Sequence, residues 1–259
     1  MKSKKYLNGI YIAIIIAFIY IPIISMIVFS FNSSKSITTW TGFSFEWYGK
    51  LFNDREIMEA IINTIMVAVI STIVSTIIGT LAAISLSKNK KIFRETVMGL
   101  SNIPILSPEI VTAIAFFVFF GAFSIEKGLT TMLLAHIAFS TPYVILTVYP
   151  KIKSLDPDLV SASADLGATP RQTLFKVILP QIRVAIIAGA AIAFTMSFDD
   201  FVISYFASGG MVQNISIYLY TLKRGIEPTV NALSTIIIIF IGIKIVYDYF
   251  KTSKNKEEE

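Results

Sequence analysis

The stretch GIYIAIIIAFIYIPIISMIVFSF, residues 9–31, contains no charged residue. An α-helix rises about 1.5 Å per residue, so about 20 such residues cross the ~30 Å hydrocarbon core of a bilayer. Lysines at positions 2, 4 and 5 precede the stretch, as in a signal peptide. However, the apolar run is longer than a signal-peptide core, and it lacks a small-x-small cleavage site. It therefore predicts a membrane helix that is retained.

Five further apolar runs follow, at residues 57–87, 97–123, 129–150, 182–207 and 229–250. Hydrophobic residues make up 54% of the chain and charged residues 15%, where a soluble domain carries about 25% charged residues. The mean hydropathy is +0.71. This composition excludes a soluble enzyme, a disordered chain and a nucleic-acid-binding domain. We expect an all-α, polytopic membrane protein with six transmembrane helices in a single domain, residues 1–259.

The distribution of lysine and arginine predicts the orientation of the chain. With a cytoplasmic N-terminus, the inner segments hold 15 of these residues and the outer segments hold 6, while Lys244 lies within the last span. Membrane proteins keep their Lys/Arg excess on the cytoplasmic side. Both termini are therefore expected in the cytoplasm.

Several kinds of chemistry are missing from the sequence. The chain has no cysteine and one histidine, His136, which lies among apolar residues and is interpreted as a packing residue. We therefore expect no metal site. The sequence contains no G-x-x-x-x-G-K-[ST] phosphate loop and no nucleophile–base pair. The chain is accordingly not expected to be an enzyme or to bind a cofactor, and ATP, if used, would be hydrolysed on another chain.

The inner loop 151–181 predicts two short helices that meet at a glycine corner. Asp156 can cap the first helix, and Gly167 can end it. Thr169 and Gln172 have the spacing of a capping box for the second helix. The corner is interpreted either as a knob that docks on a cytoplasmic partner or as a hairpin lying on the bilayer. The residues by themselves leave both interpretations open.

Three carboxylates lie well away from the ends of the predicted spans, namely Glu109 in the third and Asp199 and Asp200 in the fifth. A charge near the bilayer centre costs about 2.5–3.5 kcal/mol on the insertion scale, so these residues are candidates for a substrate path. Adjacent helical residues point about 100° apart. We therefore expect Asp199 to face the path and Asp200 to lie behind it. No lysine or arginine lies mid-membrane, which favours a cationic substrate.

Two aromatic residues complete the predicted path. Trp47, in the first outer loop, is a candidate at the entrance, although most aromatics of this loop are expected to be interfacial anchors. Tyr20 lies close to Pro22 in the first span and is a further candidate. Aromatic faces attract cations with about 0.5–2 kcal/mol each.

The glycine corner resembles the EAA loop of ABC importer permeases, which has the pattern E-A-A-x-x-x-G followed by a Leu-Pro pair. In that family the loop is the coupling helix that sits on the ATPase subunit. Ser161 stands here where the family has Glu, and Ser163 where it has the second Ala. The corresponding residues are Ser161, Ala162, Ser163, Asp165, Gly167, Leu179 and Pro180.

Nearly the whole chain resembles the PotC-type permease subunits of spermidine/putrescine ABC importers. The resemblance rests on motifs that include Tyr20-Ile21-Pro22-Ile23, Ser107-Pro108-Glu109-Ile110-Val111 and Ser197-Phe198-Asp199-Asp200. It implies a MetI-like fold, a location in the bacterial cell membrane and polyamine import by alternating access. The implied partners are a second permease of PotB type, two ATPase subunits of PotA type and an extracytoplasmic polyamine-binding protein of PotD type.

Two alternatives remain at this point. The same machinery can carry another small solute, although acids without mid-membrane bases argue against an anion. Intramembrane carboxylates equally suit an ion-coupled secondary transporter. Such a transporter needs no cytoplasmic docking loop, so the glycine corner favours the ATP-driven system.

Overall fold

The computed structural model describes residues 2–36, 38–222 and 228–257, and the side chains of 8–36, 38–222, 228–244, 246 and 247. Within these ranges the chain is helical, and its only extended pairing is an isolated bridge between Asn32 and Phe43. The expectation of an all-α protein is confirmed.

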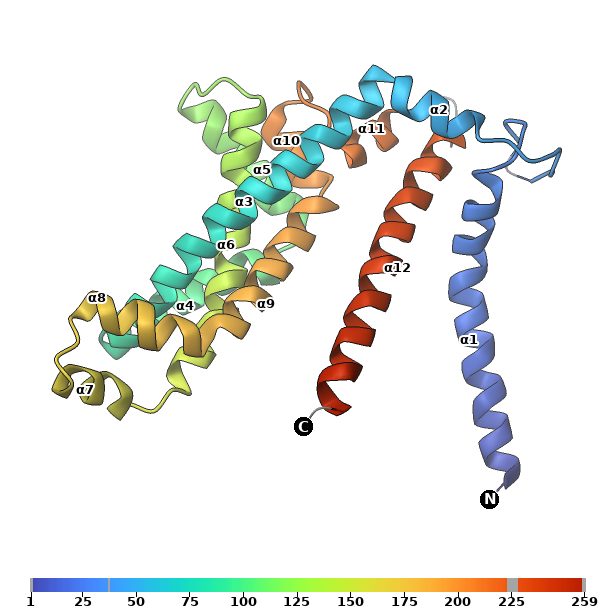
Figure 1. Cartoon of the computed structure of the whole chain (residues 1–259). Coiled ribbons are helices and arrows are strands. Elements are labelled where there is room, and N and C mark those ends of the chain that lie inside the picture. Colours follow the sequence, from blue (N-terminus) through green and yellow to red (C-terminus); the bar gives the residue numbers. More distant parts are fainter. Residues whose placement is uncertain (1, 37, 223–227, 258–259) are drawn as a thin grey trace. The chain divides into compact units, whose positions relative to one another are not determined.

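The chain forms two compact units (Figure 1). The first comprises Met1–Met58 and Thr221–Glu259, and the second comprises Glu59–Tyr220. In the first unit, the C-terminal helix packs against both other helices. The helices of this unit are α1 (Lys2–Phe29), α2 (Glu46–Asn53) and α12 (Pro228–Glu257).

The second unit contains most of α3 and the following helices up to α11. Its core has two clusters of buried side chains, one around Val144 and Ile182 and the other around Phe139 and Ile203. Its elements are α3 (Arg55–Lys88), α4 (Lys91–Leu106), α5 (Glu109–Ala122), α6 (Leu129–Lys153), α7 (Asp158–Asp165), α8 (Pro170–Gln172), a π-helix (Thr173–Ile178), α9 (Leu179–Phe198), α10 (Val202–Ser208) and α11 (Ile215–Thr221).

Four helical segments are long and apolar enough to cross a membrane. They are Asn8–Phe29, Arg55–Lys88, Leu129–Lys153 and Pro170–Phe198. The helices α4 and α5 qualify as a fifth candidate if they are counted as one broken span. The apolar part of α12, Pro228–Lys244, is shorter.

The predicted third span, 97–123, is not one kinked helix. The helix α4 ends at Leu106, α5 begins at Glu109, and the two are bent by 108°. Ser107 and Pro108 between them are extended, with ψ angles of 144° and 134°. A residue before proline is driven out of the helical region, which explains why the chain leaves the helix at Ser107.

The predicted fifth span, 182–207, has different boundaries at both ends. One continuous helix runs from Pro170 to Phe198, so the second helix of the glycine corner continues into the membrane span instead of stopping before it. Pro180 has no N–H to donate to the preceding turn. The π-helix lies just before this proline, and the Leu179 N–H donates to the Leu174 carbonyl. At the other end, α9 stops at Phe198 and α10 begins as a separate helix.

Close packing in the second unit depends on Gly79. A Cβ atom at this position would lie 2.6 Å from the Val144 Cβ and 3.1 Å from the Thr141 carbonyl. We expect Gly79→Ala to destabilise the protein by about 1–3 kcal/mol, because α3 and α6 must move apart. Thermal unfolding of the purified protein measures the loss. The matched variant Gly99→Ala meets no atom within 4 Å and is expected to be neutral or stabilising; equal losses for both variants would contradict the packing argument.

Candidate functional site

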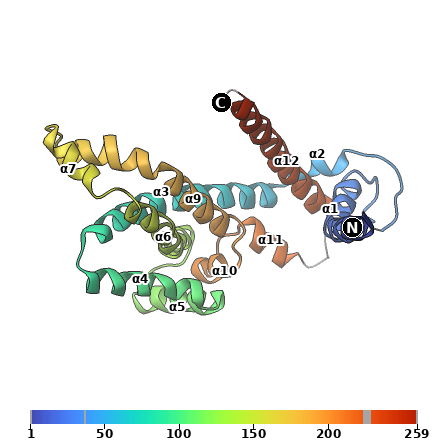
Figure 2. The ribbon, with the colours of Figure 1, turned by 90° about the horizontal axis from the view of Figure 1, so that it is seen from below.

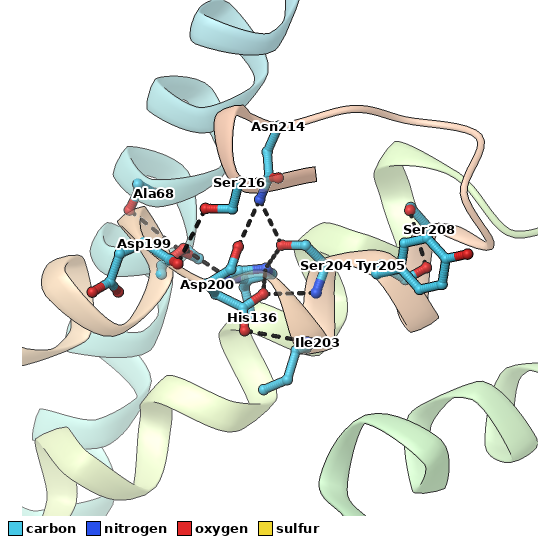
Figure 3. A network of polar contacts seen from close by, with 12 residues as sticks. Ala68, His136, Asp199, Asp200, Ile203, Ser204, Tyr205, Ser208, Asn214 and Ser216 are labelled. Carbon is cyan, nitrogen blue, oxygen red and sulfur yellow. Dashed lines mark hydrogen bonds and ion pairs between the residues drawn. The ribbon is translucent and has the colours of Figure 1, made fainter. Parts of the chain in front are cut away.

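A buried polar network surrounds His136, whose side chain is 1% exposed (Figure 3). Its Nδ1 lies 2.7 Å from the Ser197 hydroxyl, at the end of α9. Its Nε2 lies 2.9 Å from the Ser204 hydroxyl and 3.4 Å from the Asp200 Oδ2. Both ring nitrogens have partners, so the interpretation of His136 as a buried, satisfied histidine is confirmed. The sequence did not predict which residues it joins.

A chain of hydroxyl groups extends these hydrogen bonds. Ser71 on α3 donates to the Ser197 hydroxyl at 3.0 Å. The Ser197 hydroxyl thus lies between Ser71 and the Nδ1 of His136, while the Nε2 faces Ser204 and Asp200. The network therefore connects α3, α6, α9 and α10 through buried polar groups.

Asp200 organises the break between α9 and α10. Its carboxylate oxygens accept the backbone N–H groups of Ile203 at 3.2 Å and Ser204 at 2.7 Å, which caps the start of α10. Its carbonyl accepts the Asn214 side-chain amide at 2.8 Å, and the same amide donates to the Ser204 hydroxyl at 2.9 Å. The side chain is 4% exposed. The Asp200 carboxylate is therefore buried and holds the start of α10 in place.

Asp199 differs from its neighbour Asp200 in exposure and in hydrogen bonding. It is exposed, and its carboxylate points away from His136 (Figure 3). That carboxylate forms no hydrogen bond in the part of the chain that the structure describes, whereas its backbone carbonyl accepts the Ser216 hydroxyl at 3.1 Å. The two aspartates follow the end of α9, so the 100° offset expected from a continuous helix does not apply to them. The C-terminal break of α9 separates them instead.

Glu109 joins the two aspartates from another part of the chain. It is the exposed first residue of α5, immediately after the α4–α5 break. Asp200, Asp199 and His136 all act electrostatically on its carboxyl group. The helices α5 and α10 lie side by side (Figure 2). Two helix breaks therefore bring the three predicted carboxylates of the second unit together.

The residue after Asp200 is Phe201, whose ring packs against two tyrosine rings. The Phe201 ring lies 4.6 Å from that of Tyr220 and 5.7 Å from that of Tyr205, measured between centroids. Tyr205 and Tyr220 are 39% and 70% exposed, so their rings are accessible. The site thus combines negative charge with open aromatic faces.

The two aromatic candidates of the first unit have different surroundings. Trp47 is 4% exposed, and its indole N–H donates to the Asn32 carbonyl at 2.6 Å. The ring therefore holds the loop before α2 in place and is buried within the chain. Tyr20 is 54% exposed on α1. The part of either ring in a substrate path stays a prediction.

The glycine corner forms as its local sequence predicts. The Asp156 carboxylate accepts the Asp158 N–H at 2.9 Å at the start of α7. Gly167 has a φ of +76°, and Gly167 and Ala168 donate their N–H groups to the carbonyls of the last turn of α7. Thr169 and Gln172 form the expected capping box, so these local signals are confirmed.

The corner presents both fixed and open surfaces. The Ser163 hydroxyl is buried and lies 2.8 Å from the Thr173 hydroxyl, which ties α7 to the following helix. Ser161, Ala162, Asp165 and Pro180 are exposed and Leu179 is half-buried. Two large apolar side chains also face outward here, Leu166 at 89% and Phe175 at 66% exposure. Within this chain the corner is therefore an exposed knob with apolar side chains on its surface.

Residues 75–255 match the family described as "Binding-protein-dependent transport system inner membrane component". The chain belongs to this family. It is therefore a multi-pass membrane protein and a permease component of ABC importers, in agreement with its apolar helices.

Relatives and solved structures agree with the assignment. The permease is 35% identical over 254 residues to the spermidine/putrescine transport system permease protein PotC of Haemophilus influenzae, covering 98% of this chain and 99% of the relative. The resemblance to PotC-type permeases is thus confirmed. A crystal structure of a bacterial ABC transporter that imports the acidic polysaccharide alginate contains a chain of the same fold. The TM-score is 0.73 at 16% identity, covering 97% of this chain and 96% of that one.

The same fold occurs in a complex of that kind of transporter with its extracytoplasmic partner. It is the alginate ABC transporter bound to an alginate pentasaccharide-bound periplasmic protein, with a TM-score of 0.67 at 17% identity and coverage of 95% and 93%. These similarities establish the MetI-like permease fold for the present chain.

The buried network gives the first prediction for the site. We expect His136→Leu to destabilise the permease by at least about 2 kcal/mol, because it leaves the Ser197 and Asp200 side chains with a lost partner in a buried place. His136→Gln retains a donor and an acceptor and should cost less. Thermal unfolding of the two purified variants provides the comparison, and unchanged stability of His136→Leu would contradict the role of the network.

The glycine corner gives the second prediction. At the Gly167 φ of +76°, a residue other than glycine has a backbone strain of about 1–2 kcal/mol. A Cβ atom at this position would have no atom within 4 Å, so steric contacts add nothing to this strain. We therefore expect Gly167→Ala to loosen the corner through backbone strain alone, with a smaller effect for Gly167→Asn. Hydrogen–deuterium exchange over residues 158–173 should rise from the wild type through Gly167→Asn to Gly167→Ala. Equal exchange in all three proteins would show that the left-handed glycine does not hold the corner.

Proposed function

We propose that this chain is a permease subunit of an ATP-driven importer that moves polyamines such as spermidine or putrescine into the cell by alternating access. The observation that carries the proposal is the convergence of Glu109, Asp199 and Asp200 at two helix breaks. The name of the PotC relative supports the same substrate class.

The chemistry of the cluster fits a polycation. A polyamine nitrogen loses water as it enters the membrane, and an unpaired buried charge is very costly. Carboxylates compensate this charge, and aromatic faces add cation–π attraction. Neither lysine nor arginine is among the groups that act on Glu109 or Asp200 in the described part of the chain. An anionic solute would find no counter-charge at this cluster.

The broken helices support a path at this place. Irregular backbone at membrane depth is tolerated where it is buried in protein or lines a water-filled cavity. We assign Asp199 and Glu109 to the path, with Asp200 holding the break behind them. Trp47 and Tyr20 are proposed as further aromatic residues along the path, with the indole N–H of Trp47 also holding its loop.

We propose six spans with both termini in the cytoplasm. The four long apolar helices, the broken α4–α5 pair and the apolar part of α12 supply the six candidates. The 15-to-6 distribution of Lys and Arg supports the orientation. The two compact units then serve one permease domain over residues 1–259.

We propose that the glycine corner docks on a separate ATPase subunit, so this chain itself hydrolyses no ATP and needs no cofactor. The exposed Leu166 and Phe175 support a protein partner, because large exposed apolar side chains favour burial. The docking loop also favours this mechanism over an ion-coupled secondary transporter. The proposed assembly contains a second permease of PotB type, an ATPase dimer of PotA type and an extracytoplasmic polyamine-binding protein of PotD type.

The carboxylates provide the test of the proposed function. We expect Asp199→Asn and Glu109→Gln to reduce polyamine uptake by about 10- to 150-fold each, the effect of losing one charge-assisted contact of about 1.5–3 kcal/mol. Each change keeps the side-chain shape and deletes one charge. The measurement is uptake of labelled spermidine and putrescine per assembled complex.

The controls separate transport from folding. Glu126→Gln removes an exposed acid in the loop between α5 and α6 and should leave uptake unchanged. Asp200→Asn weakens the cap of α10 and should lower the yield of assembled complex, with a smaller effect than Asp199→Asn on uptake per complex. Full uptake by the double variant Glu109→Gln/Asp199→Asn would contradict a path lined by these carboxylates.

A further inference from the structure

A cavity of about 230 Å³ lies where α3 and α6 end, against the start of α7. It is remote from the carboxylate cluster in the sequence and shares none of its residues. Most of its walls are apolar, with two lysines among the polar residues. The lining residues are Ile84, Ser87, Lys88, Ile152, Lys153, Leu155, Asp156, Pro157, Leu159, Val160, Val177 and Ile178.

The two lysines mark the ends of two candidate membrane spans. Lys88 is the last residue of α3, and Lys153 is the last residue of α6. Both side chains are exposed, and neither forms an ion pair within the described ranges. The nearby Asp156 carboxylate accepts the Asp158 N–H, so it acts as a helix cap in addition to its charge. Two lysines without an ion pair therefore line a cavity whose other residues are apolar except Ser87 and Asp156.

The position and the lining together specify the chemistry of an occupant. Lysines at the ends of membrane spans lie at the level of the lipid headgroups. Ile84 and Ile152 belong to the apolar spans themselves, so basic side chains and apolar side chains of the spans line the same cavity. The cavity is smaller than the ~300–1,000 Å³ that enclose drug-sized ligands. It suits part of an amphiphile whose remaining tail stays in the bilayer.

We infer that this cavity binds the phosphate headgroup of an anionic phospholipid, with Lys88 and Lys153 as its counter-charges. Basic pockets between membrane helices recognise such headgroups. A free phosphate ion would use the lysines but not the apolar walls, so the lipid accounts for both features. Leu159 and Val160 of α7 form part of the wall, and the lipid therefore contacts the glycine corner directly.

Native mass spectrometry of the purified complex tests the inference, with phosphatidylglycerol and phosphatidylcholine as probes. The wild-type complex should bind phosphatidylglycerol in preference to phosphatidylcholine. The variant Lys88→Gln/Lys153→Gln should bind phosphatidylglycerol at least about tenfold more weakly, since a charge-assisted contact is worth about that factor or more. Lys88→Arg/Lys153→Arg keeps both charges and should retain the lipid.

A matched control separates the cavity from the general basic surface. Lys90→Gln/Lys151→Gln removes the same charge near the same helix ends, and neither residue lines the cavity. It should bind phosphatidylglycerol as the wild type does. Equal losses in the two glutamine variants would overturn the inference, and so would displacement of the lipid by inorganic phosphate alone. These outcomes are independent of the substrate, so they do not depend on the proposed polyamine transport.

Discussion

The structure depends on one constraint, which is that a helix broken among apolar residues must find partners for its free backbone groups. No water is available in the hydrocarbon region to satisfy them. At the break after Phe198 the Asp200 carboxylate accepts two N–H groups at the start of α10, and the Asn214 amide donates to the Asp200 carbonyl. These bonds make it possible for the chain to leave the helix there. Because these bonds stabilise the break, the Asp199 carboxylate can be exposed there.

The buried hydroxyl groups extend the same principle between helices. Ser71, Ser197 and His136 form a chain in which each group has a partner, so that three helices are fixed relative to one another without an unpaired polar atom at these positions. Polar side chains between membrane helices favour specific partners more than they add stability, because each contact is worth about 0.6–2 kcal/mol. The network therefore fixes where the carboxylates lie.

Local signals in the sequence predict the glycine corner well, because short-range geometry determines it. A glycine at a left-handed position and a Thr/Gln pair at capping-box spacing are visible without any tertiary information. The Ser163–Thr173 contact across the corner is not visible in this way, since it requires the angle between the two helices. The continuation of the second helix through the π-helix into α9 was not predicted, for a related reason. A proline such as Pro180 can mark the start of a helix. It can equally lie inside a helix whose backbone hydrogen bonds shift around it.

The sequence contains a signal for the break between α9 and α10. Aspartate is a preferred helix cap, and Asp200 precedes Ile203 and Ser204 at capping distance. Because Asp200 lies in a run of apolar residues, the pattern predicts a charge within a continuous span instead. The α4–α5 break, in contrast, is announced by Pro108, although its 108° bend is not. The hydrogen bonds around His136 connect its own helix with three others, and no pattern in a single sequence names them.

The two adjacent aspartates show how structure assigns different roles to identical side chains. The Asp200 carboxylate accepts two hydrogen bonds that hold α10, so its part in folding alone explains this residue. No such explanation applies to Asp199, whose carboxylate supports no hydrogen bond in the described chain. The Asp199 carboxylate, unpaired at a helix break in a membrane protein, contributes repulsion toward Glu109 and offers no compensating contact. That cost is understandable if a cation supplies the missing partner, which makes Asp199 the residue at which folding and transport are most clearly separated.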